Sequence, residues 1–211
     1  MMPAESAAPD LQVRHRPVQA RGRVRFDAIL TAARDLLAEG GVEGFTIDDV
    51  ATRAGIPVGS VYQFFPNKFA IVAELDALDT AALIDDLAAS SERLALGDWQ
   101  SETNDLIDLV AAHWVDDPTR RAVWLAMRST AATRSLAAEH SRTLVTTLLP
   151  MIQLLTPGRT LDEQVTICEV VVEMSQSLLH FSVSDGEPNP ATVRELKRML
   201  RAYLRAVARI A

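Results

Sequence analysis

The chain has 211 residues, of which 48% are hydrophobic and 23% charged. These values are typical of a globular protein and exclude a disordered or collagen-like chain. The single cysteine, Cys168, excludes an intrachain disulfide and a cysteine-based zinc cluster. No apolar run approaches the roughly 18 residues that cross a membrane, and the first residues lack the pattern of a secretory signal. We therefore expect a cytoplasmic protein with no membrane partner.

The formal net charge of −7 is unevenly distributed. Residues 1–70 are neutral overall, so the whole acidic excess lies in residues 71–211. Residues 11–25 contain five arginines and no acidic residue, namely Arg14, Arg16, Arg21, Arg23 and Arg25. Two interpretations stay open: a patch that attracts a polyanion, or a solvated disordered tail. We expect residues 1–19 to form a basic flexible arm.

Apolar residues recur every three and four positions, which predicts helices from the start of the chain. A first helix carries the stripe from Phe26 to Leu37 and ends at Gly40-Gly41. Thr46 and Asp49 have the spacing of a capping box at the start of a short helix over 47–54. Pro57 precedes a third helix over 58–64, and Asn67 can cap a fourth helix that begins at Lys68.

Longer helices follow, separated by proline and glycine. We place them at 68–94, 99–116, 119–129, 131–155, 160–184 and 190–210. The predicted fold class is all-α, with an N-terminal three-helix head over 20–67 and a larger C-terminal helical body over 68–211.

The second and third predicted helices have the dimensions of a helix-turn-helix. Val61 and Phe65 are four residues apart and can pack on the first helix, which turns the other side chains outward. The outward set is Val58, Gly59, Ser60, Tyr62 and Gln63. Gln63 can bond an adenine edge, Val58 can contact a thymine methyl, and Ser60 or Tyr62 can reach a phosphate. A buried strand over this stretch is the alternative, which the flanking caps and prolines disfavour.

Over residues 20–74 the sequence resembles the TetR family of transcriptional regulators. The resemblance rests on Ile29-Leu30-x-Ala-Ala, the run from Gly41 to Ala51, Ala54-Gly55-Ile56, Gly59-Ser60-Val61-Tyr62 and Phe65-x-Asn67-Lys68. It implies that Tyr62 and Lys68 contact the DNA backbone and that Val58, Gly59, Ser60 and Gln63 lie on the groove-facing helix. Two positions depart from the pattern. Pro57 stands where members often carry a capping serine, and Phe64 where a polar aromatic is common.

Lys68 has a physical reason to bind phosphate, since its ammonium joins the free N–H groups at the start of a capped helix. Thr46 is expected to cap its helix and to touch phosphate as well. Arg53 could also reach phosphate, although a free surface arginine is an equal alternative. The predicted DNA-binding set is Thr46, Val58, Gly59, Ser60, Tyr62, Gln63 and Lys68.

The last two predicted helices are expected to pair with a second copy of the chain. The helix over 160–184 is apolar on two sides, and a partner would cover the side that the chain itself does not. The resemblance implies the same pairing of the last two helices into a four-helix bundle. The predicted dimer residues are Val172, Leu179, Leu196, Leu200, Tyr203 and Val207.

A ligand pocket is expected in the body, where aromatic and methionine side chains occur with a few polar groups. The predicted lining is His113, Trp124, Met127, Met174, Ser177 and His180. Core packing is the alternative for each of these residues. Cys168 is expected to be a small buried residue rather than a redox sensor.

These patterns and the resemblance predict a sequence-specific repressor that binds an inverted-repeat operator as a homodimer and is released by a small-molecule effector. An activator with the same head stays open. We expect no catalytic residues, metal or cofactor, because the four histidines are scattered and no hydrolase or phosphate-loop motif occurs. A helical interaction protein that uses the helix-turn-helix only for packing is the remaining alternative.

Overall fold

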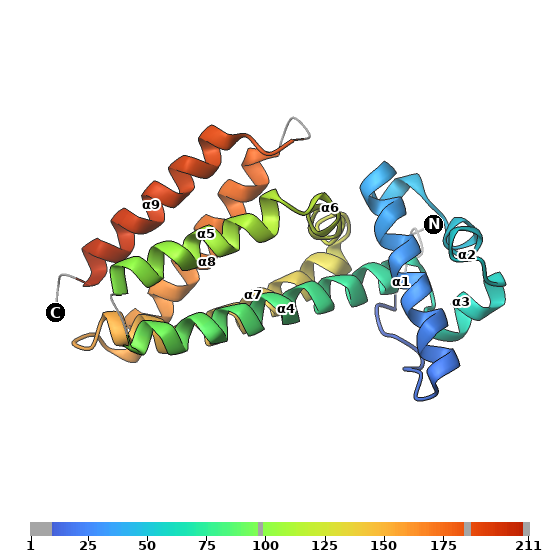
Figure 1. The fold of residues 1–211 in the computed structure, drawn as a ribbon, viewed down its shortest axis with the longest axis horizontal. Helices are drawn as coiled ribbons and strands as arrows, with labels where there is room; N and C mark the ends of the chain where they lie inside the picture. Colours follow the sequence, from blue (N-terminus) through green and yellow to red (C-terminus); the bar gives the residue numbers. More distant parts are fainter. Residues whose placement is uncertain (1–9, 97–98, 184–186, 209–211) are drawn as a thin grey trace, which may run out of the picture. The chain divides into compact units, whose positions relative to one another are not determined.

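The computed structural model describes residues 10–96, 99–183 and 187–208, and every regular element in these ranges is a helix (Figure 1). The elements are α1 (Ala20–Gly40), the 3-10 turn η1 (Val42–Gly44), α2 (Ile47–Ala54), α3 (Val58–Phe64), α4 (Lys68–Leu96), α5 (Trp99–Val115), α6 (Pro118–Ala126), α7 (Ala131–Leu155), α8 (Leu161–Ser182) and α9 (Pro190–Ala208). The predicted all-α class is confirmed. The predicted helix ends agree with the structure to within three residues, apart from the ends predicted at 184 and 210, which lie outside the described residues.

The chain divides into two compact units. We call the described residues of 10–79 and 118–138 the head unit, and those of 80–117 and 139–208 the body unit. Two helices, α4 and α7, are divided between the units. The sequence placed the boundary at residue 67 and assigned residues 118–138 to the body, whereas the compact units divide α4 after residue 79 and group residues 118–138 with the head.

The core of the head unit explains this difference. Side chains of α1, α2, α3 and α4 bury one another, as the apolar stripe of α1 predicts. The same core includes Val123, Ala126 and Met127 from α6 and the turn after it, all of them buried. Figure 1 shows α6 beside α1, and the two helices are in contact. The short α6 therefore completes the head, although about 40 residues of sequence separate it from the head segment of α4.

Polar links hold the helices of the body unit together. Arg201 on α9 donates to Asn104 on α5 at 2.7 Å and also to Asp108, and Lys197 pairs with Asp108 at 3.0 Å. Between α5 and α4, Nε2 of His113 on α5 lies 2.7 Å from a carboxylate oxygen of Asp86 on α4. These contacts join α4, α5 and α9.

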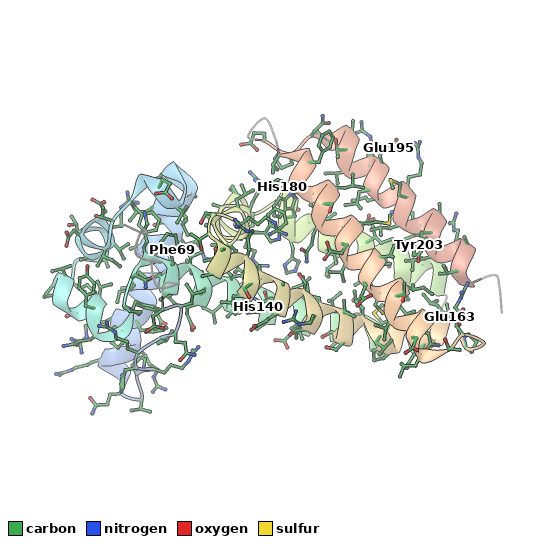
Figure 2. All side chains as sticks on the ribbon, turned by 180° about the vertical axis from the view of Figure 1, so that it is seen from behind. Phe69, His140, Glu163, His180, Glu195 and Tyr203 are labelled. Atoms are coloured by element: carbon green, nitrogen blue, oxygen red, sulfur yellow. The ribbon has the colours of Figure 1, made fainter. Side chains whose placement is uncertain are left out.

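The helix α8 starts at a capping box. Thr160 accepts from the backbone N–H of Glu163, and the Glu163 carboxylate accepts from the Thr160 N–H at 2.8 Å. These hydrogen bonds lower the pKa of the Glu163 carboxyl. Figure 2 shows Glu163 at this end of α8. Gln164 next to it is buried and donates to the carbonyl of Thr156, which ties the preceding turn to the helix.

Within the described ranges, no helix combines the length and the apolar character needed to span a membrane.

Candidate nucleic-acid interface

The helix α2 has a well-defined start. Thr46 accepts a hydrogen bond of 3.3 Å from the N–H of Asp49, and Asp49 accepts one of 2.8 Å from the N–H of Thr46. The predicted capping box is therefore present, and the hydrogen bonds from Thr46 lower the pKa of the Asp49 carboxyl. Thr46 is exposed, as a phosphate contact would require.

The turn between α2 and α3 is short because of two residues. Gly55 adopts the left-handed conformation with φ 67°, which other residues disfavour. Pro57 follows with φ −62° as the N-cap of α3 and makes no side-chain capping bond. The departure from a capping serine thus leaves α3 without that bond, although the proline ring sets the backbone angle at which the helix starts.

The inner face of α3 is held by aromatic packing. Phe26 of α1 stacks on Phe65 with ring centroids 5.0 Å apart and meets Phe64 edge-on at 5.5 Å. Val61 is fully buried between them and α2, as its spacing from Phe65 predicts. Phe64 is also buried, so the second departure from the family pattern serves the core rather than a DNA contact.

The outer face of α3 carries the side chains predicted to read bases. Val58 and Tyr62 are 39% and 44% exposed, which is unusual for large apolar and aromatic residues. Gly59 and Gln63 are exposed, and Ser60 is half-buried. Four of the five predicted residues of this helix are thus exposed beside the turn that follows α2, and Ser60 lies at the edge of this face.

Lys68 has closer partners than the sequence suggested. Its Nζ donates to the carbonyl of Val42 at 2.7 Å and to that of Phe45 at 3.2 Å, and it lies 3.8 Å from Glu43. Asn67 caps the helix as predicted, by accepting from the N–H of Ala70 at 3.0 Å. The ammonium therefore holds the loop before Thr46, and a phosphate contact through its remaining donor stays a prediction.

Arg53 is held in an ion pair and is not a free surface side chain. Its two terminal nitrogens donate to the two carboxylate oxygens of Glu39, each at 2.8 Å. This pairing raises the pKa of Arg53 and lowers that of Glu39. The structure gives Arg53 a role in joining α1 to α2.

The arm before α1 makes several contacts with the head over its described residues 10–19, and its flexibility stays a prediction, with residues 1–9 outside the described ranges. The backbone N–H of Arg14 donates to the carbonyl of Phe64 at 2.8 Å, and the Arg14 guanidinium donates to the carbonyl of Tyr62 at 2.9 Å. Arg16 makes a two-pronged ion pair with Glu74 of α4. The sequence analysis missed these contacts. Their only signal is a carboxylate, Glu74, inside the apolar run 70–75, which needs a partner.

The residues predicted to line a ligand pocket fall in different places. Trp124 and Met127 belong to the head unit, where Met127 is fully buried in the core and the Arg128 guanidinium lies 3.1 Å from the Trp124 ring centre. Ser177 and His180 are exposed on α8, so the structure does not place them in an interior. These positions disfavour a ligand contact for the four residues, because two lie in the head unit and two are exposed, and their role in a pocket stays a prediction.

His113 and Met174 lie in the body unit, and their role in a ligand site stays a prediction. His113 is partly buried beside Asp86, on the two helices that supply Leu87 and Leu106 to an apolar cluster with Met151 of α7. Met174 is half-buried on α8.

The predicted dimer residues are mostly internal. Val172, Leu179, Leu196, Leu200 and Val207 are all buried within a single chain, and Tyr203 is half-buried on α9 (Figure 2). A side chain that is already buried has no apolar surface left to remove from water at a partner. These five belong to the core of the body unit, so their burial disfavours a contact with a second copy, which stays a prediction.

The other apolar side of α8 is the one left uncovered. It is formed by Val171, Met174, Leu178 and Phe181, spaced three and four residues apart. The first three are half-buried and Phe181 is 64% exposed. Cys168, on the covered side, is fully buried, and this burial raises the pKa of its thiol to about 11. Its predicted role as a small apolar residue agrees with this position.

Comparisons with known proteins agree with this arrangement. Residues 29–75 match the family of bacterial regulatory proteins described as the tetR family, and residues 97–208 match the tetracyclin repressor-like C-terminal domain. A transcriptional regulator of the helix-turn-helix type, YdeS of Bacillus subtilis, is 30% identical over 110 residues, 46% of this chain and 56% of that protein. The tetracycline repressor protein class A from transposon 1721, of Escherichia coli, is 40% identical over 79 residues, 37% of this chain and 35% of that protein.

The chain thus spans only about half or less of these two relatives. A solved structure of a TetR-family transcriptional regulator from Streptomyces coelicolor aligns with a larger share of this chain than the two relatives do. It is 27% identical, aligns over 87% of this chain and 99% of its own, and has a TM-score of 0.57. Because the matched C-terminal model alone spans more than half of the sequence, the chain belongs to the TetR family of transcriptional regulators.

Proposed function

We propose that this DNA-binding regulator recognises an inverted-repeat operator as a homodimer and represses transcription until a small-molecule effector releases it. As a TetR-family transcriptional regulator, it is not an enzyme. The observation that carries the proposal is the division of α3 into two faces. Val61 and Phe64 anchor the helix, while Val58, Tyr62 and Gln63 are exposed on its outer side.

The exposed face suits the major groove chemically. The amide of Gln63 offers a donor and an acceptor in the geometry that matches N6 and N7 of adenine. Val58 can pack on a thymine methyl, and Gly59 lets the backbone approach the groove closely. Tyr62 and Ser60 carry hydroxyls for phosphate oxygens. Because α3 is anchored by buried aromatic rings, these groups are presented without a large cost in ordering.

The homodimer is supported by the uncovered side of α8. Its stripe from Val171 to Phe181 is apolar and partly exposed, and Met199 on α9 is 45% exposed. A second copy packing on this stripe would bury it. A two-fold dimer of such regulators reads two half-sites about one helical turn apart, and this predicts an inverted repeat.

Release by a small molecule is supported by the body unit. The partly buried His113–Asp86 pair lies on α4 and α5, which supply Leu87 and Leu106 to an apolar cluster with Met151 of α7, and such a mixture is typical of ligand sites. One relative is named as a tetracycline repressor. We propose that an effector that favours one conformation of the body weakens operator binding by its difference in affinity for the two states.

Selection of bound duplexes from a random DNA pool tests the proposal. We expect a palindromic motif. We expect Gln63→Ala to relax the preference at one position in each half-site, at a cost of about 1–3 kcal/mol on the preferred base. Gln153→Ala, at an exposed glutamine of α7 in the body unit, is the matched control and should leave the motif unchanged. If no duplex is enriched even at low salt, the helix-turn-helix serves packing only and the proposal fails.

A further inference from the structure

The arginines at the start of α1 differ from the other arginines of the head unit. Arg34 and Arg53 each form a two-pronged ion pair with a carboxylate. Arg21, Arg23 and Arg25 are exposed, and none of them has an ion pair or hydrogen-bond partner for its side chain among the described residues. Three unpaired cations within five residues repel one another, and this repulsion is relieved when a polyanion binds.

The arm before these arginines is held against the recognition helix. Arg14 donates from its backbone to Phe64 and from its guanidinium to the carbonyl of Tyr62, at the C-terminal end of α3. Asn67 donates to the carbonyl of Asp10 at 2.8 Å, so the arm is attached at a further point. The guanidinium of Arg14 uses one of its five donors in the Tyr62 bond, which leaves others for a ligand beside α3.

The arm also contacts the first turn of α1, where two of the three arginines share one flank. Pro17 packs so closely on Gly22 that a Cβ at Gly22 would lie 2.8 Å from the Pro17 Cβ. Arg25 is three residues after Gly22 and four after Arg21, so it is a helix neighbour of both.

Arg23 projects from a different flank of α1. It is separated from Arg21 by about 200° and from Arg25 by about 160° around the helix, whereas Arg21 and Arg25 are only about 40° apart. Its neighbour one turn on is a carboxylate, Asp27, whereas Arg25 has the apolar Ile29 at the same spacing. The flank of Arg21 and Arg25 is thus purely basic, and the flank of Arg23 carries a neutralising charge.

We propose that Arg14 at the end of α3 and the pair Arg21 and Arg25 on one flank of α1 form a basic strip that binds phosphates of the operator outside the bases that α3 reads. This inference rests on the proposed function, since it extends the DNA contact of the same head. It assigns Arg16 and Glu74 as positioning residues, because their ion pair attaches the arm to α4.

Phosphates rather than base edges are the partners because of the width of α1. A helix with its side chains is about 10–12 Å across, and the minor groove of B-DNA is about 6 Å wide. The major groove is already allotted to α3 in the proposed complex. Arginines on the flank of α1 can therefore reach the outer backbone but not the groove floor, and such contacts add affinity without sequence preference.

The test compares salt dependence among four full-length proteins on one duplex, the motif selected by the wild-type protein. The variants are Arg21→Gln with Arg25→Gln, Arg21→Lys with Arg25→Lys, and the matched control Arg23→Gln. We expect the double glutamine variant to reduce the slope of log affinity against log salt by about two per half-site, since each phosphate contact contributes about 0.9. We expect the lysine pair to keep the slope and the Arg23→Gln control to keep the slope.

Each remaining outcome overturns the strip. A wild-type slope in the double glutamine variant removes the phosphate contacts, and an equal loss in Arg23→Gln makes the effect one of overall charge. Loss of the slope in the lysine pair, which keeps both positive charges, shows that the slope does not come from phosphate neutralisation at these two positions. Circular dichroism melts of all variants exclude misfolding as the cause. If the wild-type protein selects no motif at all, the proposed function fails, and that result is distinct from any slope change.

Discussion

The guanidinium of Arg16 donates two hydrogen bonds of 2.7 Å to the carboxylate of Glu74, a residue 58 positions further along the chain. The Arg16 side chain is 68% exposed, whereas that of Glu74 is 5% exposed on α4. The carboxylate is therefore held in the protein interior by a cation that reaches it from the surface. This geometry attaches the arm to the helix that leads out of the head unit.

Breaking this pair should destabilise the head unit. In Arg16→Gln the buried carboxylate of Glu74 loses its cation, and we expect the free energy of unfolding to fall by about 1–2 kcal/mol, a value discounted for the exposure of Arg16. Arg21→Gln removes an arginine without a partner and should change stability by less than about 0.5 kcal/mol. Urea denaturation of the two variants makes the comparison. Equal stability of the two would show that the ion pair contributes nothing to the fold.

Lys68 should contribute to stability, whatever it contributes to DNA binding. Lys68→Met keeps most of the aliphatic stem but removes the charged donor from the carbonyls of Val42 and Phe45. We expect the unfolding free energy to fall by about 1–3 kcal/mol, the usual range for hydrogen bonds that involve a charged group. Thermal or urea unfolding measures this effect. The salt slope of DNA binding by the same variant tests the phosphate contact separately, with a decrease of about one expected for one lost contact.

The uncovered side of α8 predicts a difference between two substitutions. Phe181→Glu places a charge on a side chain that is 64% exposed, so we expect a folded protein that no longer dimerises. Leu200→Glu places the charge at a site that is 5% exposed within the chain, so we expect it to lower the stability of the body unit itself. Sedimentation velocity together with circular dichroism distinguishes the two results. A fully dimeric Phe181→Glu protein would contradict the proposed interface.

Cys168 should be chemically inert in the folded protein. Burial raises the pKa of its thiol to about 11, so almost no reactive thiolate is present at pH 8. Ellman's reagent should therefore react with the denatured protein and only negligibly with the native one. The raised pKa also makes the stability of the fold depend on pH. The thiol's contribution is complete below its ordinary pKa of 9.0 and is lost as the pH rises towards 11, because the unfolded state then releases the proton more readily.

Local features of the fold could be predicted from the sequence because their physical causes are local. The capping box of Thr46 and Asp49 depends on a spacing of three residues, and the turn at Gly55 depends on one residue that tolerates a positive φ. The outward position of Gln63 follows from the helical period once Val61 is placed inside. For these reasons the helix limits and the exposed face of α3 agree with the prediction.

Only the tertiary structure decided which apolar surfaces are internal and which distant charges meet. The helix α8 is apolar on two sides, and periodicity alone does not distinguish the side of Val172, which is buried, from that of Phe181, which is exposed. The Arg16–Glu74 pair and the packing of Met127 in the head core join segments that are remote in sequence. Such contacts depend on how the helices pack against one another, and no spacing within a single helix encodes that packing.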